Sequence, residues 1–83
     1  MVRVNNLIVP DDYLKEVWWA EGTKEHHEVR YGYLLAQYRM GSELCYIVTL
    51  GNINTTVIRH LKKYYYTEKD AYASIVDLPS QIH

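Results

Sequence analysis

The chain has 83 residues, of which 48% are hydrophobic and 23% charged, and its formal net charge is −1 at pH 7. This composition excludes a disordered or low-complexity chain, and the length predicts one domain over residues 1–83. A net charge so close to zero provides no overall attraction to nucleic acid or acidic lipid. The longest apolar runs also fall far short of the ~18 residues that cross a membrane.

The cysteine content and the chain length together predict the cellular location and the oligomeric state of the protein. Cys45 is the only cysteine, which excludes disulfides within one chain. We recognise no secretion signal, so we expect an intracellular, cytoplasmic location. A chain this short buries only ~60% of the surface that its unfolded form exposes. Self-association is a ready source of further buried area, and we therefore expect a homodimer.

The first predicted element is a short edge strand or extended arm over residues 2–9. Its start alternates between apolar and polar residues, Asn5-Asn6 interrupt it, and Pro10 ends it. Proline lacks the N–H that a central strand needs, so the arm is expected at a sheet edge.

A helix is predicted next, over Asp12–Glu21. Asp12 can cap its N-terminus and Gly22 can end it. Three apolar residues at helical spacing form its expected buried stripe: Leu14, Val17 and Trp18. Trp19 falls outside this stripe, so we expect an exposed indole that marks a contact site.

After a polar loop over residues 23–28, the pattern becomes that of an antiparallel hairpin. Strands are predicted from Val29 to about Tyr38 and over residues 44–50, with a turn at Met40-Gly41-Ser42-Glu43 between them. Gly41-Ser42 fits the two-residue hairpin loop that requires glycine first. Both faces of this hairpin are apolar, so both need cover from helices, further strands or a second subunit.

The two-residue loop also predicts a register for the hairpin. It pairs Tyr38 with Cys45, Ala36 with Ile47, Leu35 with Val48 and Tyr33 with Leu50. Strict alternation then places Tyr31 and Tyr33 on one face and Tyr38 on the other.

Two helices are predicted in the last third of the chain. The first, Thr55–Tyr66, begins after Asn54 and has an apolar stripe formed by Val57, Ile58, Leu61 and Tyr65. The second, Glu68–Val76, begins at a capping box formed by Thr67 and Asp70, with a strand over residues 73–78 as the alternative. The fold class predicted overall is α+β, a single small domain in which an antiparallel, hairpin-based sheet packs with two or three short helices.

One cluster contains the residue types of a metal site, Glu25-His26-His27-Glu28. In an extended backbone it offers two ligands to each side, whereas zinc needs three or four that converge. We therefore interpret it as a solvated loop and expect no metal and no cofactor. Cys45 lies in mid-strand among apolar neighbours, where cysteine is usually a small buried hydrophobe.

The aromatic composition carries the main functional hypothesis. The chain has nine tyrosines, two tryptophans and no phenylalanine. So many amphipathic rings cannot all lie in a core of this size, so some belong to a contact surface. We predict a non-enzymatic interaction protein, of the kind that viral or mobile elements use to inhibit a host protein. Its expected partner-binding residues are Trp19, Tyr31, Tyr33 and Tyr38.

Two alternatives involve nucleic acid. A basic, tyrosine-rich helix would contact phosphates and stack on bases through Arg59, His60, Lys62, Lys63, Tyr64 and Tyr66. Alternatively, a small metal-independent ribonuclease would draw its acid, base and phosphate clamp from Tyr38, Arg39, His60 and Lys63.

Overall fold

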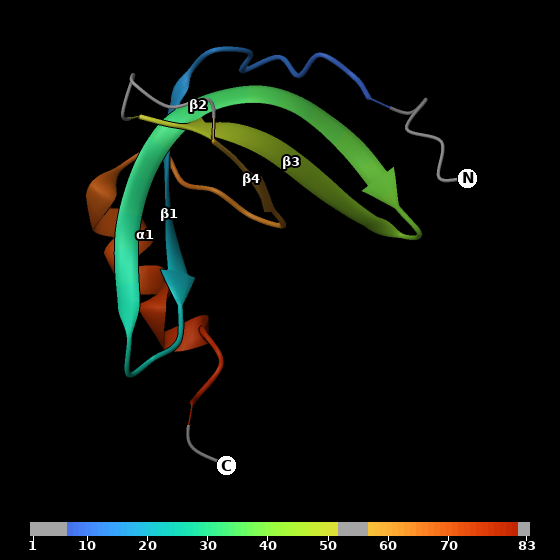
Figure 1. Cartoon of the computed structure of the whole chain (residues 1–83). Coiled ribbons are helices and arrows are strands. Elements are labelled where there is room, and N and C mark those ends of the chain that lie inside the picture. Colours follow the sequence, from blue (N-terminus) through green and yellow to red (C-terminus); the bar gives the residue numbers. More distant parts are fainter. Residues whose placement is uncertain (1–6, 52–56, 82–83) are drawn as a thin grey trace.

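The computed structural model describes residues 7–51 and 57–81, which form one four-stranded antiparallel sheet and one short α-helix (Figure 1). The elements in chain order are β1 (Glu16–Gly22), β2 (His27–Met40), β3 (Glu43–Leu50), β4 (Ile58–Leu61), α1 (Glu68–Ala73) and the 3₁₀ helix η1 (Ser74–Asp77). The sheet order is β1-β2-β3-β4, and every pair is antiparallel. The α+β class is therefore confirmed, but the described residues contain one α-helix where two or three short helices were expected.

The predicted arm is only partly within the described residues, since residues 1–6 lie outside them. Ile8 forms an isolated antiparallel bridge with Gln37 of β2. This contact places the segment before Pro10 along an edge of the sheet, as the proline predicted.

The helix predicted over Asp12–Glu21 is wrong, because most of this segment is strand β1. A turn closed by a hydrogen bond from the Lys15 N–H to the Asp12 carbonyl (2.8 Å) precedes the strand. Leu14 then takes a left-handed conformation, with φ at 67°, which stops helical propagation. From Glu16 onward the backbone pairs with β2, and this pairing overrides the helical spacing of the apolar residues.

The hairpin of β2 and β3 is confirmed, and so is its loop. Gly41 has φ at 63°, the left-handed value that its turn position needs. The observed register matches the predicted one from Met40 back to Ala36, but a β-bulge then shifts it between Leu34 and Ala36. Leu34 therefore lies opposite Val48, the partner that strict alternation assigned to Leu35. The polar loop predicted over residues 23–28 is shorter than expected, since β2 begins at His27.

The helix predicted over Thr55–Tyr66 is also wrong. Residues 52–56 lie outside the described part, and the rest forms strand β4 and an extended segment. Ile58, like the tyrosine run that follows, is a residue type that favours strands. Tyr65 exchanges both backbone hydrogen bonds with Trp18 of β1, at 2.7 and 2.8 Å. The chain thus returns from β4 to the outer edge of β1, and the curved sheet rolls toward a closed form (Figure 1).

The third predicted helix is confirmed, including its start. The Thr67 side chain accepts a hydrogen bond from the Asp70 N–H at 3.1 Å, which is the cap that the sequence pattern predicted. The helix continues through α1 into η1, which ends at Asp77, so the alternative strand over residues 73–78 is excluded.

The core lies on the concave side of the strongly bent sheet. Its fully buried side chains are Val17, Trp19, Leu34 and Val48, with exposed fractions of 0 to 1%. The expectation that Trp19 is exposed is therefore wrong. In a strand its side chain points to the same face as Val17, whereas a helix would have separated the two.

Candidate binding surface

The convex face of the sheet carries three rows of side chains that run across β2, β3 and β4. Because paired residues of antiparallel strands point to the same side, the pairing defines these rows. They are Tyr33–Thr49–Ile58, then Ala36–Ile47–His60, and finally Tyr38–Cys45 at the hairpin end. Ile58 and His60 are exposed and most of the others are half-buried, so this convex face is largely open to solvent.

The bulge near Leu35 is what brings the tyrosines of this surface together. Before it, Tyr31 and Tyr33 alternate with the buried residues of β2; after it, the alternation shifts by one residue. Tyr38 therefore lies on the same face as Tyr31 and Tyr33, although strict alternation places it on the opposite one. Three of the four expected partner-binding residues thus share the convex face, and the fourth, Trp19, lies buried on the concave side.

Tyr31 is held in place by its neighbours at the β1 end of this face. Its ring lies 5.1 Å from that of Trp18, measured between centroids, and tilted by 38°. Its other side covers Gly51, where any added Cβ would overlap the Tyr31 ring. The Gly51 N–H also donates to the Tyr31 carbonyl at 2.8 Å. A side chain fixed in this way loses little conformational entropy when a partner binds.

Tyr38 and His60 form a polar pair at the other end. The Tyr38 hydroxyl lies 2.9 Å from His60 Nδ1, and the two rings meet edge to face. Desolvation, followed by the neighbouring Cys45 thiol, raises the pKa of Tyr38. The phenol therefore stays protonated at neutral pH and keeps a hydrogen that it can donate. Cys45 itself is buried and free, as the sequence predicted.

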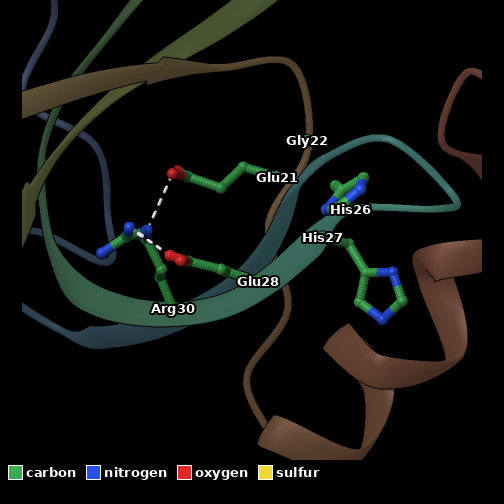
Figure 2. A pocket seen from close by; sticks show the side chains of 6 residues that line it. All are labelled: Glu21, Gly22, His26, His27, Glu28 and Arg30. Atoms are coloured by element: carbon green, nitrogen blue, oxygen red, sulfur yellow. Dashed lines mark hydrogen bonds and ion pairs between the residues drawn. The ribbon is translucent and has the colours of Figure 1, made fainter. Parts of the chain in front are cut away.

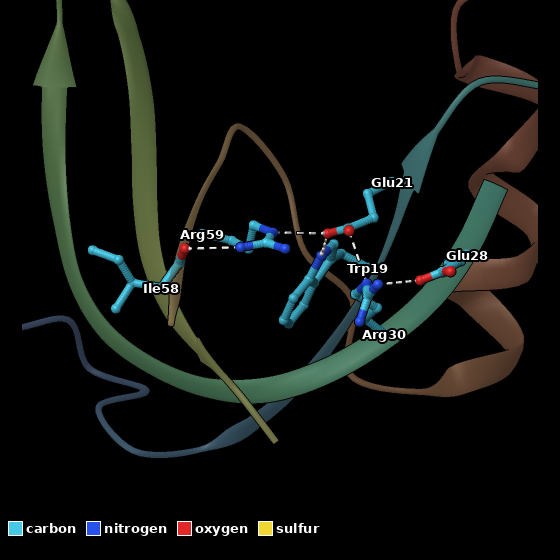
Figure 3. Close-up of polar contacts among 6 residues, drawn as sticks. All are labelled: Trp19, Glu21, Glu28, Arg30, Ile58 and Arg59. Atoms are coloured by element: carbon cyan, nitrogen blue, oxygen red, sulfur yellow. Dashed lines mark hydrogen bonds and ion pairs between the residues drawn. The ribbon is translucent and has the colours of Figure 1, made fainter. Parts of the chain in front are cut away.

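The concave face is closed by a cluster of charged groups around Glu21 (Figure 3). Its carboxylate accepts from the Trp19 indole at 2.9 Å and from Arg30 Nε at 2.7 Å. Arg59 Nε of β4 lies 3.4 Å from the same carboxylate, so Glu21 connects three strands. Arg30 is also paired with Glu28. The cluster contains two acids and two bases, so its charges balance and its role is structural.

An open, polar hollow of about 330 Å³ lies beside this cluster (Figure 2). His26 and His27 line it together with Gly22, Glu21, Glu28 and Arg30. Several of the polar groups that line it are engaged with one another or with the backbone: Arg30 binds both glutamates, and His27 Nδ1 lies 3.0 Å from the Lys24 carbonyl.

The segment Glu25–Glu28 does not converge on a metal. Within the described ranges, no three histidine, cysteine or acidic side chains come together as a metal site requires. Glu25 instead accepts from the Gln81 N–H at 2.5 Å and from the Ser80 hydroxyl at 3.1 Å. These bonds, the first above all, lower the pKa of Glu25. The loop between β1 and β2 is therefore hydrogen-bonded to residues 80–81.

The residues of the expected basic helix do not share one face. Arg59 points into the concave cluster and His60 onto the convex face, as neighbours in a strand do. Lys62 Nζ lies 3.2 Å from a Glu43 oxygen, and Lys63 Nζ lies 5.5 Å from the centre of the Tyr65 ring. In the ribonuclease set, Tyr38 and His60 are in contact, but Arg39 follows Tyr38 in the strand and so faces the opposite side.

Tyr64 and Tyr66 bind Asp12 rather than facing solvent freely. Both hydroxyls donate to the same carboxylate oxygen, Oδ2, at 3.1 and 2.6 Å. These bonds, with that from Tyr66 the larger, lower the pKa of Asp12. Partial burial and the same contacts raise the pKa of Tyr64. This Asp12 contact joins the first turn to the segment that bridges β1.

Sequence reasoning missed Ile47, Ile58 and Thr49 as members of the convex surface. The pairing of β3 with β4 would have indicated them, but β4 was predicted as helix.

No family model, no curated protein and no solved structure matches this chain. No helix in residues 7–51 and 57–81 is long and apolar enough to cross a membrane.

Proposed function

We propose that this chain is a non-enzymatic binding protein that contacts another protein through the convex face. The observation that supports this most directly is the bulge near Leu35, which gathers Tyr31, Tyr33 and Tyr38 on one open side of the sheet. Tyrosine offers a large rigid ring with a hydroxyl at its tip, and it is enriched where proteins meet.

The composition of the face supports a partner that is largely uncharged. In its three rows, the only side chain that can carry a positive charge is His60, and Glu16, which pairs with Tyr33, adds one carboxylate to the same face. Such a surface fits a shallow apolar patch with acceptors placed for the phenol hydroxyls. It offers little attraction to phosphate, and its binding should depend weakly on salt.

We further propose self-association as a homodimer and a location inside the cell. The free, buried thiol of Cys45 suits a reducing compartment. All nine tyrosines lie in described segments, and none of them is buried, so the chain keeps aromatic surface that a second subunit or a partner can cover.

The test is capture of a partner with a matched set of variants. Tyr31→Ser with Tyr33→Ser alters the convex face, whereas Tyr72→Ser removes a still more exposed ring from α1. We expect a protein retained by the wild type and by Tyr72→Ser to be lost from the double variant, in nuclease-treated extract. Equal retention by all three proteins would contradict the convex-face proposal.

Salt distinguishes this function from nucleic-acid binding. Affinity for a protein partner should change less than about 3-fold between 50 and 200 mM salt, because the face has almost no charge. A nucleic-acid binder with several phosphate contacts loses roughly 10³-fold or more over that range. A steep salt dependence that Lys62→Glu with Lys63→Glu abolishes would replace the proposal by the nucleic-acid alternative.

A further inference from the structure

The segment Leu7–Val9 forms an edge of the sheet, and no other described residue pairs with its outer side. Ile8 exchanges two backbone hydrogen bonds with Gln37 of β2, at 2.8 and 2.9 Å. Successive residues of a strand turn their backbone groups to opposite sides, so Leu7 and Val9 direct theirs away from β2. Neither of these two residues has a backbone hydrogen bond to any other described residue. Their side chains, with that of Ile8, are 48 to 70% exposed.

The opposite edge of the sheet, strand β4, is protected against such pairing. Arg59 lies within it and donates to the Ile58 carbonyl at 3.3 Å, which occupies an outward acceptor. Lys62 and Lys63 follow directly. Charged side chains of this kind are a common protection of edge strands against pairing with other chains. Leu7–Val9 is entirely aliphatic and has no such protection.

We propose that Leu7–Val9 pairs antiparallel with the same segment of a second copy, across a two-fold axis. This inference rests on the self-association proposed above and names its surface. Leu7 of each copy exchanges backbone hydrogen bonds with Val9 of the other, and the two Ile8 residues face each other on the axis. The segment is uncharged, so no like charges meet. The sheets of the two copies become continuous through their β2 strands.

The surface area of the chain is consistent with an occupant as large as a second copy. A compact monomer of 9.8 kDa exposes roughly 5,200 Å², whereas this chain exposes 6179 Å². The difference, about 1,000 Å² summed over the whole chain, is comparable to the ~800 Å² that each partner buries in a standard interface. The Cα radius of gyration of 13.4 Å also exceeds the ~12 Å typical of this length. Exposed Tyr13 and Leu14 continue the same edge toward β1 and extend the apolar contact.

The first experiment measures mass by analytical ultracentrifugation over a range of protein concentrations. We expect the wild type to approach twice its 9.8 kDa chain mass. Leu7→Lys with Val9→Lys places lysines opposite each other across the axis, so this variant should remain at the monomer mass. Val76→Lys is the matched control: Val76 is 71% exposed on η1, and its substitution should leave the dimer intact. Circular dichroism should show the same fold for all three proteins, and only the two dimeric ones should have a melting temperature that rises with protein concentration.

The second experiment locates the axis. Residues opposed at a non-hydrogen-bonded antiparallel position have Cα atoms about 4.5 Å apart, within the range that a disulfide spans. Ile8→Cys should therefore form a covalent dimer on mild oxidation, whereas Val76→Cys should not.

Three outcomes would overturn the inference. A wild type that stays monomeric removes both the self-association and its surface, and leaves the convex-face function untouched. A dimer that survives Leu7→Lys with Val9→Lys but is lost in Tyr31→Ser with Tyr33→Ser would place the subunit contact on the convex face. Ile8→Cys that cross-links no better than Val76→Cys would exclude the proposed axis.

Discussion

The two faces of this one sheet are built from different side chains. The concave face holds aliphatic residues and one indole at its centre, of which Val17, Trp19 and Leu34 are at most 1% exposed, with Tyr46 and Tyr64 packed against them. The convex face holds tyrosines beside isoleucine, threonine and histidine, and remains half open. The contrast indicates that folding free energy comes mainly from the concave face and leaves the convex face available for binding. Equivalent substitutions on the two faces test whether the faces differ in their contribution to stability.

The largest expected effect separates the two neighbouring tryptophans. Trp19→Ala removes a buried ring from the core and should cost about 3–5 kcal/mol, a large share of the stability of so small a domain. Trp18→Ala removes a half-exposed ring from the convex side and should cost about 1–2 kcal/mol. Urea unfolding followed by circular dichroism measures both. Equal losses of unfolding free energy would show that the two faces contribute equally to stability.

Glu21→Gln tests the charged cluster that closes the concave side. The amide keeps one acceptor but loses the charge that Arg30 and Arg59 share, so unfolding should become easier by about 1–2 kcal/mol. Glu43→Gln is the control. Its ion pair with Lys62 is exposed on both sides, and its loss should change stability by less than about 0.5 kcal/mol. If Glu21→Gln destabilises the protein no more than Glu43→Gln does, the cluster contributes no more to stability than an exposed ion pair.

Asp12→Asn tests the contact that joins the first turn to the segment after β4. The two tyrosine hydroxyls lower the pKa of Asp12 below its ordinary value of 3.8. The contact therefore contributes its full stability above about pH 4 and loses it as the pH falls through the lowered pKa. Asp12→Asn should be less stable than the wild type at pH 7, and the difference should shrink as the pH falls through the lowered pKa of Asp12.

Asp11→Asn is the matched control for this pH dependence, since Asp11 is an exposed neighbour in the same turn. It should follow the wild type at both pH values. Melting curves of the three proteins at pH 7 and pH 2 decide the point, and a constant gap between Asp12→Asn and wild type would contradict the assignment.

The smallest expected effect lies on the convex face. Tyr33→Ser should change the free energy of unfolding by less than about 1 kcal/mol, because the ring contributes mainly to cross-strand contacts. Leu34→Ser, one position away, points into the core and should unfold the protein. A large loss from Tyr33→Ser would mean that the convex face also stabilises the fold.

Local signals in the sequence predicted the elements whose geometry is determined locally. Gly41-Ser42 specifies the hairpin loop, and Thr67 with Asp70 specifies the start of α1. Both depend on contacts between residues close in the chain, such as a cap or a turn conformation. The absence of phenylalanine and the excess of tyrosine likewise predicted the half-exposed rings.

The strands β1 and β4 could not be predicted from their own residues. Val17 and Trp18, like Ile58 and Leu61, have a spacing that fits one side of a helix. Which structure forms is decided by pairing with β2 and β3, a long-range contact that no short window contains. The bulge near Leu35 could not be predicted for a similar reason. The sequence therefore did not indicate that Tyr31, Tyr33 and Tyr38 share one face.

The bond between Trp18 and Tyr65 has a consequence for how the protein is made. Strand β1 leaves the ribosome well before Tyr65, its partner on the outer side, has been synthesised. Until Tyr65 emerges, the backbone edge of the nascent strand has nothing to pair with. This side of β1 can therefore be completed only after the segment that follows β4 has been synthesised.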